Sequence, residues 1–279
     1  MIFLLLAIGA SVLNAIILKR GETGAHDRLV VMASNYLVAA ALAVGLWLVR
    51  GAQGFSWPTL ALGLVGGIFY AGGMIMWMVA IRRSGIGTST AALRMGVVWP
   101  VLVSMVFFSE VPSLYQSLGI ALALVAILLV SLSGRLGDAS TEGSAVLLLL
   151  ATWVIAGACF VTLKVFTEVS PKSEKDALLA LIFGSAFIIS WGWVILRKRR
   201  FRRGDFASGS VFGFFNVTSN MLVLTGLQTV PGILAFPILN TGILFATGLL
   251  GVAVYGERPG LWGVLALPAA AGAIALMSL

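Results

Sequence analysis

Hydrophobic residues fill ten long runs along the chain, and polar residues are confined almost entirely to the short segments between them. Each run has roughly 17 to 25 residues, the length of α-helix that crosses about 30 Å of hydrocarbon. The pattern predicts an all-α membrane protein with ten transmembrane helices. The runs cover residues 1–18, 29–49, 58–81, 86–108, 113–133, 144–165, 176–196, 207–228, 231–254 and 260–278.

Composition agrees with this pattern, since 60% of the 279 residues are hydrophobic and only 10% are charged. The run at 1–18 has the length of a signal peptide, but no basic segment precedes it, and Lys19 and Arg20 follow it directly. We therefore expect a first helix that is retained. The connections are short and leave no room for a soluble domain.

The net charge of +8 comes from basic residues that are unevenly distributed between alternate connections. The odd-numbered connections hold 13 of the 18 Lys and Arg residues, including six in RKRRFRR at 197–203. The even-numbered connections are assigned four, which are Arg50, Lys164, Lys172 and Lys175. The positive-inside rule then puts the odd connections in the cytoplasm and both termini outside the cytoplasmic (inner) membrane. We interpret RKRRFRR as an anchor beside anionic lipid headgroups rather than as a specific ligand site, and expect no nucleic acid partner.

The second half of the chain repeats the first. FSEVPSLYQSLGIALA at 108–123 aligns with YGERPGLWGVLALPAA at 255–270, which pairs Glu110 with Glu257 at an offset of 147 residues (257 − 110). The same offset pairs Gly-Ile at 85–86 with Gly-Ile at 232–233 without a gap, and Leu-Lys at 18–19 corresponds to Leu-Lys at 163–164.

Residues 1–134 and residues 144–279 are therefore predicted to be two copies of a five-helix unit. Because five is odd, the second copy enters the membrane from the opposite side, and the two copies form an inverted repeat. Such a repeat can pack its halves in two related ways, each opening a central cavity to one side of the membrane, which is the basis of alternating access.

Ten helices in two inverted halves, each closing with an acidic-x-proline turn, resemble the drug/metabolite transporter (DMT) superfamily and specifically its EamA-type transporters. The resemblance covers essentially the whole chain, and LQTVPGILAFPILNTGILFATGLLGVAVYGERP at 227–259 carries most of it. It implies a central cavity surrounded by the third, fourth, eighth and ninth helices, helped by the first, second, sixth and seventh. It also implies transport of a small metabolite or drug, and leaves the substrate open.

Arg94 is the only charged residue in the stretch 86–108. An isolated arginine at a helix centre costs about 2.5–3.5 kcal/mol on insertion scales. We interpret Arg94 as facing a wet cavity, where it counters a carboxylate or phosphate of the substrate. The alternative is a structural arginine that binds carbonyls freed near a proline or extends to a headgroup. All ten acidic residues fall in connections or at helix ends, which disfavours proton/cation antiport.

Other polar and aromatic residues lie on the helices that the resemblance places at the cavity. The helix at 58–81 has glycine and aromatic residues along one face. This face is interpreted either as a substrate surface or as a helix-packing face. The 147-residue offset sets Arg94 opposite Thr241. The predicted substrate-binding residues are Arg94, Tyr70, Met74, Trp77, Trp99, Asn216, Asn220, Asn240 and Thr241.

Four residues are predicted to act as gates or hinges. Pro100 and Pro237 each remove a backbone donor inside a predicted span, although Pro237 also fits a purely structural kink. For Asn14 and Asn35, as for Ser11 and Tyr36, gating or interhelical bonding is as well supported as substrate contact. Glu110 and Glu257 are interpreted mainly as turn caps, with a contribution to a gate as the alternative, and Trp153 as an interface residue or a ring-stacking residue.

Enzymatic functions are disfavoured. His26 is the only histidine and the chain has no GxxxxGK[ST] phosphate loop. Cys159 is the only cysteine, so no intrachain disulfide is possible. We expect no metal and no cofactor. The favoured function is a secondary transporter of a small polar metabolite with a carboxylate or phosphate, such as an amino acid. The alternative is a flippase for a lipid-linked carrier or an accessory membrane subunit. The expected partners are the small-molecule substrate and the lipid bilayer, with the protein a monomer or homodimer.

Overall fold

The computed structural model describes residues 1–21, 27–134, 143–255 and 260–279. These residues form ten α-helices and one short 3-10 turn, and no β-strand is found among them. The helices are α1 (Ile2–Gly21), α2 (Arg28–Val49), α3 (Trp57–Met95), α4 (Val98–Phe107), α5 (Leu114–Gly134), α6 (Gly143–Val169), α7 (Lys175–Leu196), α8 (Arg203–Leu227), α9 (Gly232–Tyr255) and α10 (Leu261–Met277), with the 3-10 turn η1 at Lys172–Glu174.

Seven segments are long and apolar enough to cross a membrane, and three shorter apolar helices complete the set, at Ile2–Asn14, Leu114–Leu129 and Leu261–Met277. The expectation of an all-α membrane protein is therefore confirmed. Most helix ends lie within a few residues of the ends predicted from hydropathy.

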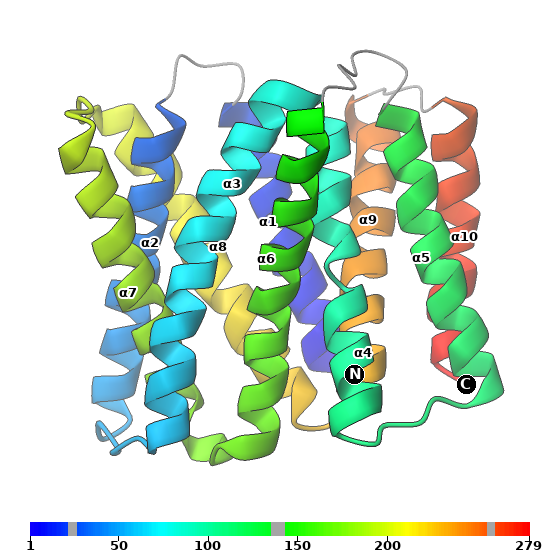
Figure 1. The fold of residues 1–279 in the computed structure, drawn as a ribbon, viewed down its shortest axis with the longest axis horizontal. Helices are drawn as coiled ribbons and strands as arrows, with labels where there is room; N and C mark the ends of the chain where they lie inside the picture. The colour runs from blue at the N-terminus through cyan, green and yellow to red at the C-terminus, as the bar shows by residue number, and fades with distance from the viewer. Residues whose placement is uncertain (22–26, 135–142, 256–259) are drawn as a thin grey trace.

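The boundary between the third and fourth helices lies at a different position from the predicted one. A break was expected at residues 82–85, but α3 remains helical through these residues and bends, so that its two parts run in opposite directions (Figure 1). The two spans agree with the prediction, at Trp57–Ser84 and Thr88–Phe107, but the helix boundary does not, because charged residues such as Arg82 end a membrane span without ending a helix. The helix is interrupted instead at Gly96 and Val97, inside the predicted span 86–108.

Pro100 explains the position of this interruption. Its ring nitrogen has no hydrogen, so it cannot donate to the Gly96 carbonyl as the helical pattern requires. The Trp99 N–H donates to that carbonyl instead, at 3.1 Å, and the Val97 N–H donates to the Arg94 carbonyl at 3.2 Å. These three-residue turns tighten the chain and separate α3 from α4.

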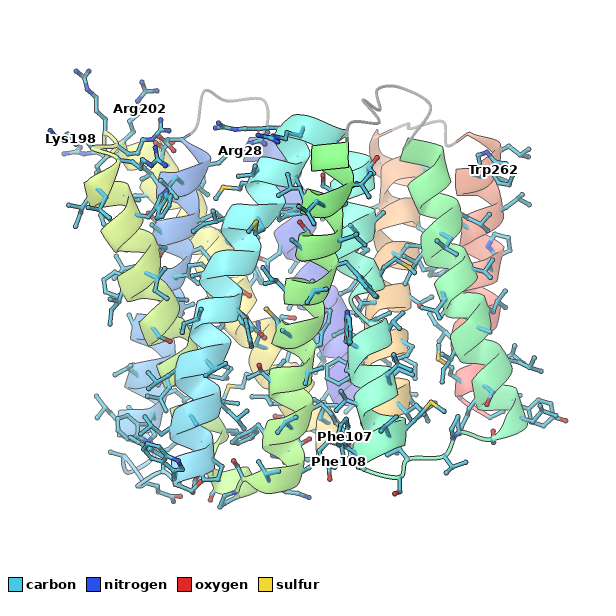
Figure 2. The ribbon with its side chains drawn as sticks, in the orientation of Figure 1. Arg28, Phe107, Phe108, Lys198, Arg202 and Trp262 are labelled. Carbon is cyan, nitrogen blue, oxygen red and sulfur yellow. The ribbon has the colours of Figure 1, made fainter. Side chains whose placement is uncertain are left out.

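The helices run roughly along one direction, and both termini lie at the same end of the bundle (Figure 1). The labelled basic residues Arg28, Lys198 and Arg202 lie at the opposite end, while Phe107 and Phe108 lie near the termini (Figure 2). We call these the basic end and the terminal end. A membrane protein with this arrangement exposes its basic residues to one side of the bilayer.

Helix pairs form the interior of the bundle. Helix α5 packs with α10, α2 with α7 and α8, α3 with α6 and α7, α1 with α8 and α9, and α4 with α6 and α9. The largest core cluster includes Tyr36, Phe166, Phe183 and Phe236. A smaller cluster around Ile233 and Ala273 joins α4, α5, α9 and α10.

Glycines allow α2 and α8 to approach closely. A Cβ atom added at Gly213 would overlap the Asn35 backbone carbonyl, and one added at Gly209 would overlap the Val31 carbonyl. Small residues at such contacts are typical of helix packing in membranes. The Asn35 and Asn216 side chains are thereby brought within hydrogen-bonding distance of each other.

Replacing Gly213 with alanine is expected to destabilise the protein by about 1–3 kcal/mol, because a backbone carbonyl cannot move aside as a flexible side chain can. The measurement is the thermal unfolding midpoint in detergent. Gly45→Ala is the matched control, since Gly45 also lies in this helix pair and no heavy atom lies within 4 Å of an added Cβ there. Equal midpoints for the two variants would contradict the close approach.

Candidate functional site

A chain of polar side chains crosses the bundle from α3 through α8 to α2. The Tyr70 hydroxyl donates to Asn220 Oδ1 at 2.6 Å, and Asn220 Nδ2 donates to Asn216 Oδ1 at 3.0 Å. Asn216 Nδ2 then donates to Asn35 Oδ1 at 3.1 Å. The structure thus joins three predicted substrate-binding residues and one predicted gate residue in a single network.

The residues of this network differ in how far they are exposed. Asn35 is fully buried, whereas Tyr70, Asn216 and Asn220 are only partly buried. Buried amides and hydroxyls are stable in an apolar interior when they are hydrogen-bonded to one another. The network therefore has a sealed end at α2 and a more accessible end at Tyr70 and Asn220.

Neighbouring side chains hold the network in place. The Tyr36 hydroxyl donates to the Tyr70 carbonyl at 2.7 Å, and the ring of Phe183 packs edge-on against Tyr70 with centroids 5.9 Å apart. Asn14, in the amide orientation that satisfies both of its ends, donates to the Phe212 carbonyl at 3.1 Å. Asn14 and Tyr36 make interhelical bonds here, which agrees with one of the two roles expected for them.

Cys159 brings α6 to the same region. Its thiol lies within electrostatic range of the Tyr36 and Tyr70 hydroxyls and is partly buried. The sequence analysis used this residue only to exclude a disulfide. A single sequence contains no signal that would have placed Cys159 beside Tyr70, because the two residues lie on different helices.

The interruption between α3 and α4 forms a second group. In a continuous helix the Met95 carbonyl would accept from the Trp99 N–H, which here bonds to Gly96 instead. The indole N–H of Trp153 donates to the Met95 carbonyl at 2.9 Å, and the rings of Trp153 and Trp99 lie 5.1 Å apart. Trp153 therefore satisfies a carbonyl that the interruption frees, and it also stacks on a ring.

Arg94 lies in the last turn of α3, directly before this interruption, and is partly buried. Within the described residues, its guanidinium group has no hydrogen-bond or ion-pair partner. The Met95 carbonyl, which the interruption frees, accepts from Trp153 and not from Arg94. The guanidinium donors of Arg94 are thus left for a ligand or water.

Two tryptophans add further donors. The indole nitrogens of Trp77 and Trp99 are buried and have no hydrogen-bond partner among the described residues. Met74 is partly buried and packs against the main core cluster. Trp99 therefore adds an N–H donor at the interruption, and Trp77 offers another on the first arm of α3.

The candidates on α9 are more deeply enclosed. Asn240 is 3% exposed and donates to the Phe236 carbonyl of its own helix at 3.1 Å. Thr241 is fully buried, and its hydroxyl has no partner within the described residues. Pro237 lies inside a helix that continues without interruption from Gly232 to Tyr255. Substrate contact by Asn240 and Thr241 stays a prediction.

A cluster of charges at the terminal end was not predicted. The sequence analysis counted Lys164 with a connection, but it lies inside α6 and is 1% exposed. Its Nζ donates to Glu110 Oε1 at 2.6 Å and to the carboxylate of Glu168, and it lies 4.9 Å above the ring of Phe108. The assignment of Lys164 to a connection was wrong because its two carboxylate partners allow it to be buried.

Glu110 also binds the start of α9. Its carboxylate accepts from the Gly232 N–H at 3.2 Å and from the Ile233 N–H at 2.8 Å. Burial alone would raise the pKa of Glu110, but the hydrogen bonds from Lys164 and Ile233 and the charge of Lys164 hold this pKa below its usual value. Glu110 therefore caps a helix in the other half of the chain. Its counterpart Glu257 lies outside the described residues.

Comparisons with known proteins bear on the fold. No protein-family model and no curated protein matches the chain. Chains of solved structures do match, 28 in number. One of them, a protein known from a crystal structure, is similar with a TM-score of 0.78 and 17% sequence identity, over 99% of this chain and 96% of that one. This likeness shows the fold alone.

Proposed function

We propose that the protein is a secondary transporter that moves a small polar metabolite bearing a carboxylate or phosphate across the cytoplasmic membrane by alternating access. The observation that carries the proposal is the position of Arg94, a partly buried guanidinium beside an interrupted helix and without a partner among the described residues. Interrupted helices within a membrane span are typical of the substrate sites of transporters.

The helix contacts support an inverted repeat of residues 1–134 and 144–279. In an inverted repeat each of the first five helices corresponds to the helix five places later, so each contact should have a counterpart. The α1–α8 contact corresponds to α6–α3, the α2–α8 contact to α7–α3, and the α1–α9 contact to α6–α4. All six of these helix pairs are in contact. The α2–α7, α4–α9 and α5–α10 pairs are each their own counterpart. Helices α1 and α6 run in opposite directions (Figure 1).

Ion pairs follow the same relation. Arg50 at the end of α2 pairs with Asp176 at the start of α7, at 2.9 Å. Arg199, just beyond the end of α7, approaches Asp27 at the start of α2, at 3.5 Å. Each pair therefore has its counterpart at the opposite end of the same two helices, which supports the two halves being related by inversion.

The donors around the interruption support an anionic substrate. Arg94 supplies a fork of N–H groups that matches a carboxylate or phosphate, and the indole N–H of Trp99 has no partner among the described residues. The acidic residues that the structure describes lie outside the spans or near their ends. The partly buried hydroxyl and amides of Tyr70, Asn216 and Asn220 would bind the uncharged polar groups of such a substrate.

The basic end would face the cytoplasm and the two termini the outside. The positive-inside rule provides this orientation, because Arg28, Lys198 and Arg202 lie at the end of the bundle away from the termini (Figure 2). The RKRRFRR segment would then lie beside anionic headgroups.

A ligand screen tests the proposal. Detergent-purified protein would be heated with amino acids, sugar phosphates, nucleobases and organic anions, and the stabilising compounds would then be tested for counterflow in proteoliposomes. We expect stabilisation by carboxylates or phosphates, since a ligand that binds only the folded state raises its stability. Stabilisation by cationic compounds alone would contradict the proposal. A lipid-linked sugar phosphate is included to test the flippase alternative.

A further inference from the structure

Lys164 is a fully enclosed charge at the terminal end of the bundle. It is 1% exposed, and its ammonium group contacts the Glu110 and Glu168 carboxylates and the face of the Phe108 ring. Removing a charge from water costs several kcal/mol unless it is paired and hydrogen-bonded. The two carboxylates and the ring provide that pairing here.

This cluster joins the two halves of the chain. Phe108 and Glu110 belong to the first half, and Lys164 and Glu168 belong to the second. Through Glu110 the cluster also holds the N-terminus of α9, whose positive dipole end offsets part of the excess negative charge. A Cβ added at Gly232 would lie 2.7 Å from Lys164 Cδ, so this side chain also packs tightly against the start of α9.

We propose that the Lys164–Glu110–Glu168 cluster is a latch that holds the terminal end of the transport pathway closed and is released when the pathway opens on that side. The inference rests on the proposed function, because it assigns a regulatory contact to the same pathway. The proposal also implies that the protein is in a conformation whose transport pathway is closed at the terminal end.

The chemistry of the cluster suits a reversible contact. A buried ion pair contributes little net stability compared with well-packed apolar side chains, so a permanent joint needs no charges. When water enters, however, the ammonium and the Glu110 carboxylate gain hydration, which lowers the cost of separation, and the Glu168 side chain is already 36% exposed. The depressed pKa of Glu110 keeps its carboxylate ionised and able to reform the bond.

The cluster is also placed where it would affect the rest of the site. Lys164 lies on the same helix as Cys159, whose thiol is within electrostatic range of Tyr70, and Trp153, which bonds to the Met95 carbonyl at the interruption. Helix α9, which Glu110 caps, packs against α1 and α4. Release of the cluster would therefore free α6 and α9 from Glu110 at the terminal end.

Cys159 provides a test that requires no substrate. It is the only cysteine in the chain and lies close to Tyr70 in the interior. A membrane-impermeant maleimide would be added to vesicles of known orientation, from the terminal side or from the basic side, and the rate of Cys159 modification would be measured. We expect slow modification of the wild type from the terminal side.

Glu110→Gln removes the charge that joins Lys164 to α9. We expect modification from the terminal side to become at least about tenfold faster, because loss of one partner leaves a buried charge unpaired and shifts the equilibrium towards the open arrangement. Glu168→Gln keeps the α9 cap intact and is expected to give a smaller acceleration in the same direction. It serves as the second variant if Glu110→Gln does not fold.

Gln116→Ala is the matched control. Gln116 accepts from the Ser113 N–H at the start of α5, close to Glu110 in the chain, and does not contact the cluster. Its rate of modification is expected to equal that of the wild type. If Glu110→Gln and Glu168→Gln are folded and are modified at the wild-type rate from both sides, the latch is overturned, whatever the ligand screen shows. Conversely, faster modification supports the latch even where the screen contradicts an anionic substrate.

Discussion

Arg94→Ala is expected to lower kcat/KM for transport of the anionic substrate by up to about 100-fold. A charge-assisted, two-pronged bond to a carboxylate or phosphate contributes up to about 3 kcal/mol, which corresponds to a factor of roughly 100. The measurement is counterflow in proteoliposomes, with the ligand-induced thermal shift as a second readout. Arg94→Lys keeps the charge but loses the planar fork, so an intermediate loss is expected.

The stability of the ligand-free protein distinguishes the two interpretations of Arg94. A guanidinium that binds substrate has no partner in the empty protein, so its removal should leave the unfolding midpoint unchanged or raise it. A structural arginine should lower the midpoint when it is removed. Arg82→Ala is the control, because Arg82 is exposed and lies elsewhere on α3. Wild-type transport by Arg94→Ala for every confirmed substrate would refute the role.

Gly157→Ala is expected to destabilise the protein by about 3 kcal/mol and to abolish most transport. A Cβ added at Gly157 would overlap the Trp99 ring, which lies between α6 and the interruption and also packs on Trp153. The bulky ring is confined on both sides, so it must leave its position or push α4 from α6. The measurements are the unfolding midpoint in detergent and counterflow.

The double variant Trp99→Ala/Gly157→Ala tests the cause. If the overlap with Trp99 is responsible, the double variant should be no less stable than Trp99→Ala alone, because the added methyl group then has space. A double variant whose loss equals the sum of the two single losses would show that Gly157 matters for another reason. Gly184→Ala is the control, since no heavy atom lies within 4 Å of an added Cβ there.

The helices were predictable because membrane spans are long apolar runs, and most predicted ends lie close to those of the structure. The exception at α3 and α4 has a physical cause. The charges of Arg82 and Arg83 mark the membrane surface, whereas the helix is interrupted by Pro100, whose missing donor acts on a carbonyl four residues earlier. Hydropathy reports where a span ends, and backbone donors decide where a helix ends.

The candidate site was predictable in part. Asn216 and Asn220 were identified because polar amides in an apolar helix must face a partner or a cavity, and Tyr70 because it belongs to an aromatic stripe; the structure joins the three residues. The pairing of Lys164 with Glu168 has the local i,i+4 spacing and was overlooked, whereas its pairing with Glu110 spans 54 residues of the chain. Such long-range pairings depend on how the helices pack, and a single sequence contains no direct signal for them.

The bend in α3 has a mechanical consequence. Residues 57–95 form one hydrogen-bonded helix around the bend, and the chain is interrupted only after Arg94. A rotation of one arm is passed to the other through the continuous hydrogen bonds of the bend. At the interruption the continuous hydrogen bonds are missing, so the chain can rotate there without moving its neighbours. We expect the two arms of α3 to turn as one lever, so that spin labels at Leu60 and Thr90 keep their separation in both states of the protein. The hinge of the first half then lies at the interruption beside Arg94, within the membrane, and not at the membrane surface.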